Sequence, residues 1–113
     1  MALVRDWTCP VSRAARILGD ECTLLLLRDL GEGPRRFSQL LGSAAGNTRL
    51  LSGRLHRLTE AGILERRILP GHPRGVEYAL TPMGRDLQPA VEVLRSFGER
   101  WLPVLCDPLA EQG

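Results

Sequence analysis

The sequence contains no lysine, few aromatic residues and only three cysteines. Cys9, Cys22 and Cys106 are far apart, and they form neither a C-x-x-C pair nor a group with histidine at ligand spacing. A disulfide framework and a structural zinc site are therefore not expected, and we expect no cofactor. Every basic side chain is arginine, whose guanidinium group is suited to binding phosphate. Codon bias nevertheless explains the absence of lysine better than function does.

The chain also lacks long apolar runs. The longest, residues 24–27, is far shorter than the roughly 18 residues of a membrane-spanning helix. Arg5 and Asp6 interrupt the first residues before any signal-peptide core builds up. We therefore expect a cytoplasmic protein with no membrane partner. The length and the balance of apolar and charged residues are typical of one soluble globular domain.

The residue sets of common enzymes are missing as well. There is no glycine-rich phosphate loop, no Ser-His-Asp set and no pair of carboxylates in a cleft-like context. His56 and His72 have no cysteine or carboxylate companions at metal-ligand spacing, which also disfavours a metal-responsive repressor. We predict that the protein is not an enzyme.

The arginines are concentrated in the middle of the sequence. Residues 35–74 hold eight arginines and two acidic residues, whereas the rest holds seven arginines and eleven acidic residues. Such asymmetry is typical of a nucleic-acid-binding face, because phosphate neutralisation supplies most of the non-specific affinity for DNA. The alternative is an ordinary solvated basic surface.

The centre of this basic region predicts an amphipathic helix over residues 48–61. Its leucines fall on one face, and its polar residues fall on the other. Asn47 is expected to cap the first turn, and Gly62 is expected to end the helix in the left-handed region. We interpret it as a DNA-reading helix.

Three shorter segments precede it. Cys9-Pro10 starts a helix that ends at Gly19, and Asp20 caps a leucine-rich helix that forms the buried centre. Residues 35–41 have the apolar spacing of a short helix, which a loop over residues 43–46 joins to the reading helix. Together these segments predict a helix-turn-helix.

Two alternating segments follow, over residues 63–69 and 76–81. In the first, Leu64, Arg66 and Ile68 oppose Glu65 and Arg67, as on the two faces of a strand. Because residues 70–75 are all turn formers, we predict a β-hairpin with a long basic tip, which is a wing.

The C-terminal region predicts one long helix that begins at Thr81-Pro82, with a kink or early break at Pro89. Apolar or small residues recur there at steps of four and three: Leu87, Val91, Leu94, Gly98, Trp101 and Leu105. A second copy of the chain is the simplest partner for this seam, and folding back onto the chain's own core is the alternative.

A set of short motifs resembles the HxlR-type winged-helix regulators of bacteria, from Cys9 to about Trp101. The motifs are C-P-V (9–11), T-L-L-L-L-R (23–28), G-P-R-R-F (33–37), L-S-G-R-L-H-R-L (51–58) and V-E-Y-A-L-T-P-M-G (76–84). The resemblance implies a homodimeric transcription factor on a pseudo-palindromic operator, joined through its N- and C-terminal helices. The sequence departs from the family pattern at Cys22, usually tryptophan, and at Gly46, usually branched and apolar, which suggests a more flexible turn.

The expected fold is therefore mainly α with a small β-hairpin: a winged helix-turn-helix with an additional C-terminal dimerisation helix. We expect a single domain over residues 1–113. It comprises an N-terminal arm and helix (1–19), the helix-turn-helix and wing (20–81) and the dimerisation helix (82–106). The expected dimer contacts are Trp7, Leu87, Val91, Leu94 and Trp101.

The expected roles on double-stranded DNA follow from the placement of each side chain. A recognition helix enters the major groove by its N-terminal half, so the candidates for base readout are Asn47, Thr48, Arg49, Ser52 and His56. The candidates for phosphate or wing contact are Arg35, Arg36, Arg54, Arg57, His72 and Arg74. Arg54 could instead be a structural ion-pair partner. At Gly53, close approach to DNA and simple tolerance of a small residue are equally good readings.

Cys9 is a candidate for redox sensing. At a helix N-terminus, the macrodipole favours the reactive thiolate, and some members of the resembled family sense oxidants or electrophiles at this position. The alternative is a small side chain packed in the dimer interface. Any small-molecule effector is unknown. A winged-helix protein-interaction module is the second functional hypothesis, which the basic middle of the chain disfavours.

Overall fold

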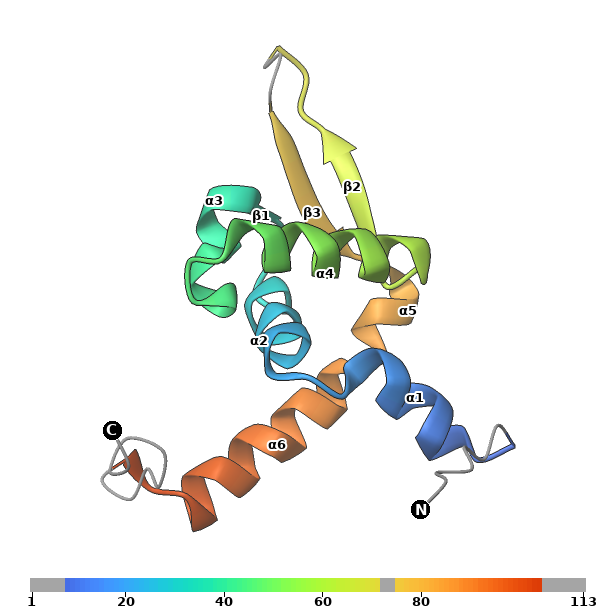
Figure 1. Ribbon diagram of the computed structural model, residues 1–113, viewed down its shortest axis with the longest axis vertical. Helices are drawn as coiled ribbons and strands as arrows, with labels where there is room; N and C mark the ends of the chain where they lie inside the picture. The colour runs from blue at the N-terminus through green and yellow to red at the C-terminus, as the bar shows by residue number, and fades with distance from the viewer. Residues whose placement is uncertain (1–7, 72–74, 105–113) are drawn as a thin grey trace.

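The computed structural model describes residues 8–71 and 75–104. The elements follow one another as α1 (Pro10–Leu18), α2 (Glu21–Leu30), β1 (Arg35–Arg36), α3 (Phe37–Leu40), the 3-10 helix η1 (Leu41–Ala44), α4 (Thr48–Glu60), β2 (Leu64–Ile68), β3 (Val76–Leu80), α5 (Pro82–Arg85) and α6 (Gln88–Trp101). In Figure 1, α2 stands at the centre and α4 lies across it. The hairpin of β2 and β3 projects to one side, while α1 and α6 diverge on the other.

The core is built around α2, as the leucine run predicts. Leu26, Leu27 and Leu30 are at most 2% exposed, and they pack with leucines of α4, α3 and the sheet. Leu24 and Leu25 are only partly buried, so the run is not buried all round. Asp20 caps α2 as predicted, with its carboxylate accepting a hydrogen bond from the Thr23 N–H at 2.8 Å.

The sheet is antiparallel with the strand order β1-β3-β2. Its register pairs Leu64 with Leu80 and Arg66 with Tyr78, so the two predicted strands form a hairpin. Their burial does not alternate, because β2 is exposed from Glu65 to Ile68 and Ala79 of β3 is buried. The prediction of a helix over residues 35–41 is wrong at its start. Arg35 and Arg36 form a short third strand against β3, and the helix begins only at Phe37.

The predicted long C-terminal helix is in fact two helices. The chain turns at residues 86–87, and Pro89 then lies in the first turn of α6, where its missing N–H costs nothing. The break therefore precedes Pro89 and produces no kink within the helix. Thr81 caps α5 as predicted, because its hydroxyl oxygen accepts a hydrogen bond from the Gly84 N–H at 3.1 Å.

The same threonine and glycine attach α5 to the turn between α4 and β2. The Thr81 hydroxyl lies 3.1 Å from the carbonyl oxygen of Ile63, and it also contacts that of Gly62. A Cβ at Gly84 would come within 2.3 Å of the Ile63 oxygen. Only glycine allows this approach, which gives the T-P-M-G motif a structural purpose.

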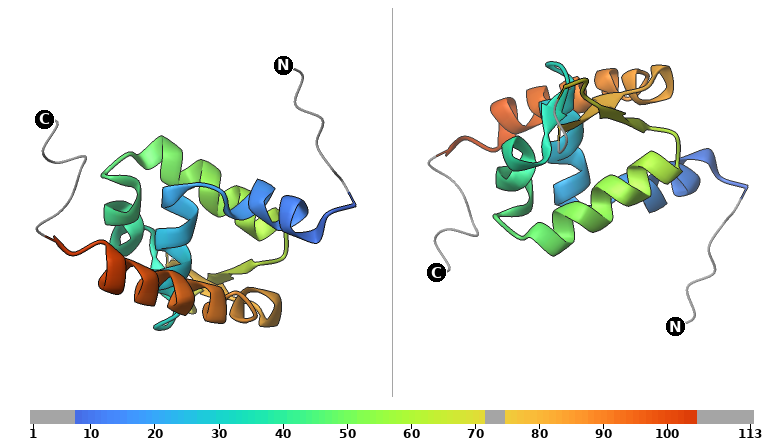
Figure 2. Two further views of the ribbon diagram at one scale, coloured as in Figure 1. Left: turned by 90° about the horizontal axis from the view of Figure 1, so that it is seen from below. Right: turned by 90° about the horizontal axis from the view of Figure 1, so that it is seen from above.

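The predicted seam on α6 needs a correction. Val91 is 7% exposed within the single chain, and Leu87 packs against the same core. These two side chains therefore bind α6 to its own chain, and Val91 also lines an open groove between α6 and α2. Leu94 and Trp101 remain exposed, as do Val93 and Phe97. Figure 1 shows α6 running away from the wing, and Figure 2 shows it along the side of the domain opposite α4. Trp7 and Leu105 lie outside the described residues.

Within the described ranges, no helix is long and apolar enough to cross a membrane.

Candidate nucleic-acid interface

The candidate reading helix, α4, has one buried face and one open face. Leu51, Leu55 and Leu58 are at most 1% exposed and fix the helix over α2. Asn47 caps its first turn, since Oδ1 accepts a hydrogen bond from the Leu50 N–H at 2.9 Å. Asn47 is exposed, and its amide N–H groups have no hydrogen-bond acceptor among the described residues. Gly62, at φ +83°, adopts the predicted left-handed conformation just after the helix.

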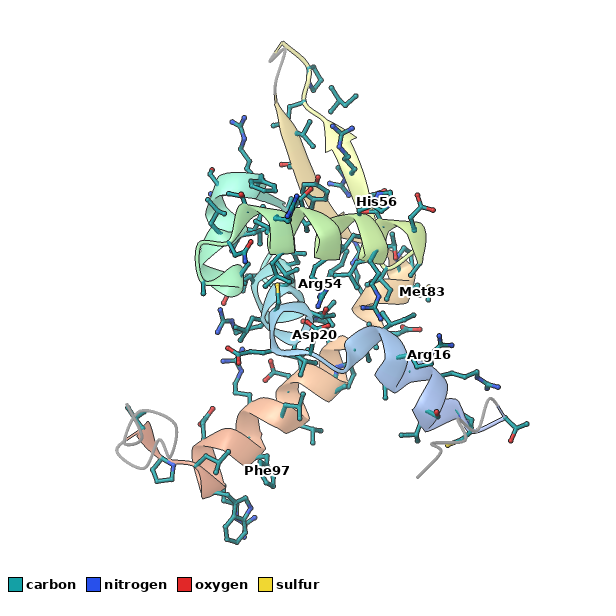
Figure 3. All side chains as sticks on the ribbon, viewed as in Figure 1. Arg16, Asp20, Arg54, His56, Met83 and Phe97 are labelled. Carbon is teal, nitrogen blue, oxygen red and sulfur yellow. The ribbon has the colours of Figure 1, made fainter. Side chains whose placement is uncertain are left out.

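The open face carries the side chains that the sequence nominates for base readout. Thr48, Arg49, Ser52 and His56 are all exposed. His56 lies one turn from Glu60, with Nε2 and Oε1 4.0 Å apart, and Figure 3 shows it on the wing side of α4. The expectation that His56 has no carboxylate companion is therefore wrong. Arg49 has no carboxylate partner among the described residues. A Cβ at Gly53 would meet nothing within 4 Å, so packing within the chain does not require glycine there.

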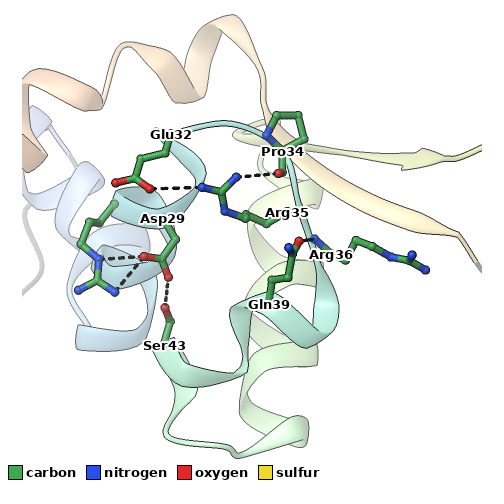
Figure 4. Close-up of polar contacts among 8 residues, drawn as sticks. Asp29, Glu32, Pro34, Arg35, Arg36, Gln39 and Ser43 are labelled. Carbon is green, nitrogen blue, oxygen red and sulfur yellow. Dashed lines mark hydrogen bonds and ion pairs between the residues drawn. The ribbon is translucent and has the colours of Figure 1, made fainter.

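The turn before α4 is held by hydrogen bonds. Gly46, at φ +78°, donates its N–H to the Leu41 carbonyl at 2.9 Å, and Ala45 also adopts a left-handed conformation. The buried Ser43 hydroxyl donates to the carboxylate of Asp29 at the end of α2, and Arg28 pairs with the same carboxylate (Figure 4). The turn is therefore anchored to the core, contrary to the loose loop that Gly46 suggests.

Arg54 does not point toward the open face. Its Nε lies 3.2 Å from Oδ2 of Asp20, and Figure 3 shows this pair between α4 and the start of α2. Burial acts to raise the pKa of Asp20, but the hydrogen bonds from Thr23 and the Arg54 guanidinium outweigh it and lower the pKa. The phosphate assignment of Arg54 is wrong in this arrangement, and the structural alternative describes it.

Two other arginines predicted to contact phosphate are engaged within the chain. The Arg57 guanidinium donates a hydrogen bond to the carbonyl oxygen of Arg16, which ties α4 to the last turn of α1. Arg35 pairs with Glu32 at 3.3 Å and donates to the Pro34 carbonyl at 3.0 Å (Figure 4). Both assignments are therefore weakened by partners that the sequence pattern did not reveal.

Arg36 keeps its side chain free of carboxylates within the described residues. Its backbone N–H donates to Oε1 of Gln39 at 2.8 Å and so begins α3, while its guanidinium is exposed. Arg66 on β2 is likewise exposed and has no ion pair among those residues. Arg66 is not among the candidates predicted from the sequence, although alternation along the strand places it on the face opposite Glu65 and Arg67. His72 and Arg74 lie outside the described residues.

The two described cysteines differ in their surroundings. Cys9 is partly buried and precedes α1, with Pro10 at the first helical position. Cys22 is buried in the core, and burial together with the Asp20 carboxylate raises the pKa of its thiol. No group of three or more His, Cys, Asp or Glu side chains placed to hold a metal occurs within the described ranges.

A helix-turn-helix with a capped second helix, an open polar face and a flanking wing defines the class of the protein. It is a winged helix-turn-helix transcriptional regulator. The chain belongs to the HxlR-like helix-turn-helix family, whose model matches residues 17–105.

Relatives and solved structures agree with this membership. An uncharacterised HTH-type transcriptional regulator of Synechocystis sp. is 38% identical over 95 residues, covering 83% of this chain and 70% of that protein. One from Mycobacterium tuberculosis is 41% identical over 93 residues, covering 82% of this chain and 59% of that protein, so this chain spans less than two thirds of its length. The redox regulator HypR in its reduced form superposes with a TM-score of 0.77 at 30% identity, covering 86% of this chain and 97% of HypR. Its oxidised form gives 0.78 at 30% identity, covering 85% and 100%.

Proposed function

We propose that the protein binds a specific DNA operator by inserting α4 into the major groove. The observation that carries the proposal is the open face of α4, where Thr48, Arg49, Ser52 and His56 are exposed opposite a fully buried leucine face. Arg49, near the N-terminal end and without a carboxylate partner among the described residues, suits bidentate contact to guanine. The other candidate, a protein-interaction module, gives no reason for this face to hold an unpaired arginine.

Fluorescence anisotropy at fixed salt tests base readout. A labelled duplex from upstream of the protein's own gene is compared with a mixed-sequence duplex of equal length. Arg49→Ala should reduce the preference for the upstream duplex by about 1–3 kcal/mol, the usual value of a bidentate base contact. Arg85→Ala, which removes an exposed arginine of α5, should leave that preference unchanged. If the wild type prefers neither duplex, the protein-interaction reading replaces specific DNA binding at this site.

The proposed regulator acts as a homodimer on a pseudo-palindromic operator. Helix α1 has no buried residue, and Val11 on it is 75% exposed. Helix α6 presents Leu94, Phe97 and Trp101, which are 49–61% exposed. These side chains continue an open groove of about 680 Å³ between α2 and α6, whose walls include Leu24 and Leu94. A second copy would bury both faces, because large exposed apolar patches mark interaction surfaces.

Sedimentation equilibrium tests the dimer. The wild type should be dimeric at micromolar concentration, and Phe97→Glu should shift it toward monomer, because a carboxylate cannot be buried against an apolar partner without cost. Ser96→Glu places the same charge at the neighbouring exposed position and is the matched control. A monomeric wild type, or equal dissociation of both variants, would show that α6 does not form the dimer interface.

The proposed regulator also responds to oxidants through Cys9. The support is the position of the thiol at the start of α1, together with the similarity to HypR, which is described as a redox regulator in reduced and oxidised forms. With diamide, the Cys9 sulfur adds to the N=N bond. A second thiol then attacks the Cys9 sulfur and breaks its bond to nitrogen, which forms a disulfide and releases the reduced hydrazine.

Release of the upstream duplex on diamide treatment tests this response. Cys9→Ser should abolish the release, whereas Cys22→Ala should retain it, because the buried Cys22 thiol has a raised pKa. Equal release of the duplex by wild type and Cys9→Ser would show that Cys9 is not the residue that responds to the oxidant.

A further inference from the structure

A cleft lined by polar and apolar side chains lies between α3 and the strands of the wing. Its volume is about 460 Å³; its polar lining comes from Arg36, Ser38, Gln39, Arg66 and Tyr78, and its apolar lining from Phe37 and Val76. Helix α3 packs against β3 here, and β2 contacts α4. The cleft therefore lies between the helix that precedes the candidate reading helix and the projecting wing.

The two neighbouring arginines of β2 have opposite surroundings. Arg66 pairs in register with Tyr78, whereas Arg67 pairs with Glu77, so their side chains leave opposite faces of the sheet. Arg67 donates from Nε to Glu65 at 2.7 Å, and its NH1 lies 3.8 Å from Glu77. Arg66 has no carboxylate partner among the described residues, and it lines the cleft. Only Arg66 of the two therefore offers an uncompensated positive charge.

The other cation of the cleft is Arg36. Its N–H is used by Gln39, which leaves the exposed guanidinium free of carboxylates within the described ranges. Two unpaired guanidinium groups and the hydroxyl groups of Ser38 and Tyr78 thus line one hollow. Guanidinium groups and hydroxyls are the donors that bind phosphate oxygens.

We propose that this cleft seats the phosphodiester backbone of the DNA duplex, with Arg66 and Arg36 as its two phosphate-binding cations. The proposal rests on the proposed DNA-binding function, and it adds a contact on the wing strands to those expected at the wing tip. When α4 lies in the major groove and the wing lies alongside, the backbone strand that borders the major groove runs past α3 and the wing. Its phosphates carry the negative charge that the two arginines of the cleft would bind. Because phosphate carries no base identity, the cleft sets affinity and register but does not select sequence.

The salt dependence of DNA binding tests this proposed phosphate-binding site, called the seat below. The association constant of wild type, Arg66→Gln and Arg67→Gln is measured against salt concentration, on the upstream duplex and on a mixed-sequence duplex. Arg66→Gln should make the slope of log K against log[salt] shallower by about 1, and it should weaken both duplexes by the same factor. Arg67→Gln, the adjacent arginine with two acidic partners, should leave the slope unchanged. Adding Arg36→Gln to Arg66→Gln should remove about one further unit.

Each result separates the seat from the proposed function. If the wild type binds neither duplex, DNA binding itself fails, and the seat fails with it. If the wild type binds but Arg66→Gln keeps the full slope, the seat is wrong while DNA binding stands. Equal losses in Arg66→Gln and Arg67→Gln would show a general charge effect and also overturn the seat. Thermal unfolding of each variant checks that these exposed substitutions leave the fold intact.

Discussion

The substitution Asp20→Asn should weaken the junction between α2 and α4. The carboxylate accepts hydrogen bonds from the N–H and the hydroxyl of Thr23, at 2.8 and 2.9 Å, and pairs with Arg54 at 3.2 Å. Asparagine keeps one oxygen for the cap, but its NH2 group meets donors where the second oxygen stood. The lost pair contributes about 0.2–1 kcal/mol and the lost hydrogen bond about 1 kcal/mol. We expect the free energy of unfolding to fall by about 1–2 kcal/mol at neutral pH.

The pH dependence of this loss follows from the direction of the pKa shift. The pKa of Asp20 is lowered in the folded state, so its ionised form stabilises the fold at pH values above the ordinary pKa of 3.8. That contribution is lost as the pH falls through the lowered pKa, because the folded protein must then take up the proton. The difference in the free energy of unfolding between wild type and Asp20→Asn should therefore be largest near neutral pH and should shrink below about pH 4.

Urea unfolding followed by far-ultraviolet circular dichroism, at a series of pH values, measures this difference. Glu21→Gln is the matched control, because it removes a neighbouring exposed carboxylate that has no ion pair among the described residues. Its effect should be small and should not follow the same profile. A difference between wild type and Asp20→Asn that stays constant from neutral pH to pH 3 would refute the argument.

Three further substitutions are predicted to change stability by amounts that thermal or urea unfolding can resolve. Gly84→Ala should cost about 1–3 kcal/mol, because the new Cβ would lie 2.3 Å from the Ile63 oxygen, and an unchanged stability would show that the close approach is not required. Ser43→Ala should cost about 1.5–3 kcal/mol through the lost hydrogen bond to Asp29, and a neutral result would contradict the anchored turn. Gly53→Ala should stabilise α4 by about 0.5–1 kcal/mol, since its Cβ meets open space, and a loss of stability would mean that the glycine packs within the chain.

Local chemistry made most of the fold predictable from the sequence. Caps at Asp20, Asn47 and Thr81 mark helix starts because their side chains satisfy the first N–H groups within three residues. Leucine periodicity located the buried face of α4, since a helix that packs on one side repeats at short range. These signals need no knowledge of distant contacts.

The failures involve contacts between residues far apart in the chain. Arg35 and Arg36 look helical beside Phe37, but pairing with β3, about forty residues later, extends them into a strand. Arg54 and Arg57 look like free cations on α4, yet Asp20 and the Arg16 carbonyl lie against them in the fold. For Val91, a spacing of four and three marks an apolar face without saying which surface covers it.

The pairing of the arginines also explains how a broadly basic segment forms a directional surface. Arg54 joins α4 to the start of α2, and Arg57 joins α4 to the end of α1. Both side chains therefore make contacts within the domain. Arg49 and Arg66 lack carboxylate partners within the described ranges and lie on the side of α4 and the wing. Because ion-paired charges largely cancel beyond a few ångströms, the net field comes from the arginines that have no carboxylate partner. Arg57 keeps its charge, since its partner is a neutral carbonyl. The eight arginines and two acidic residues of residues 35–74 therefore overstate the positive charge available to DNA, while the unpaired arginines determine where that charge is presented.

The position of α4 is coupled to both helices that expose apolar side chains. Arg57 contacts the last turn of α1, and α2 packs against both α4 and α6. At the other end of α2, Nε2 of Gln88 donates to the Leu27 carbonyl at 3.3 Å and holds the start of α6. Packed helices shift as units because their interiors have few voids. Arg57 therefore links α4 to α1, α2 links it to α6, and Thr81 and Gly84 add a further connection through α5.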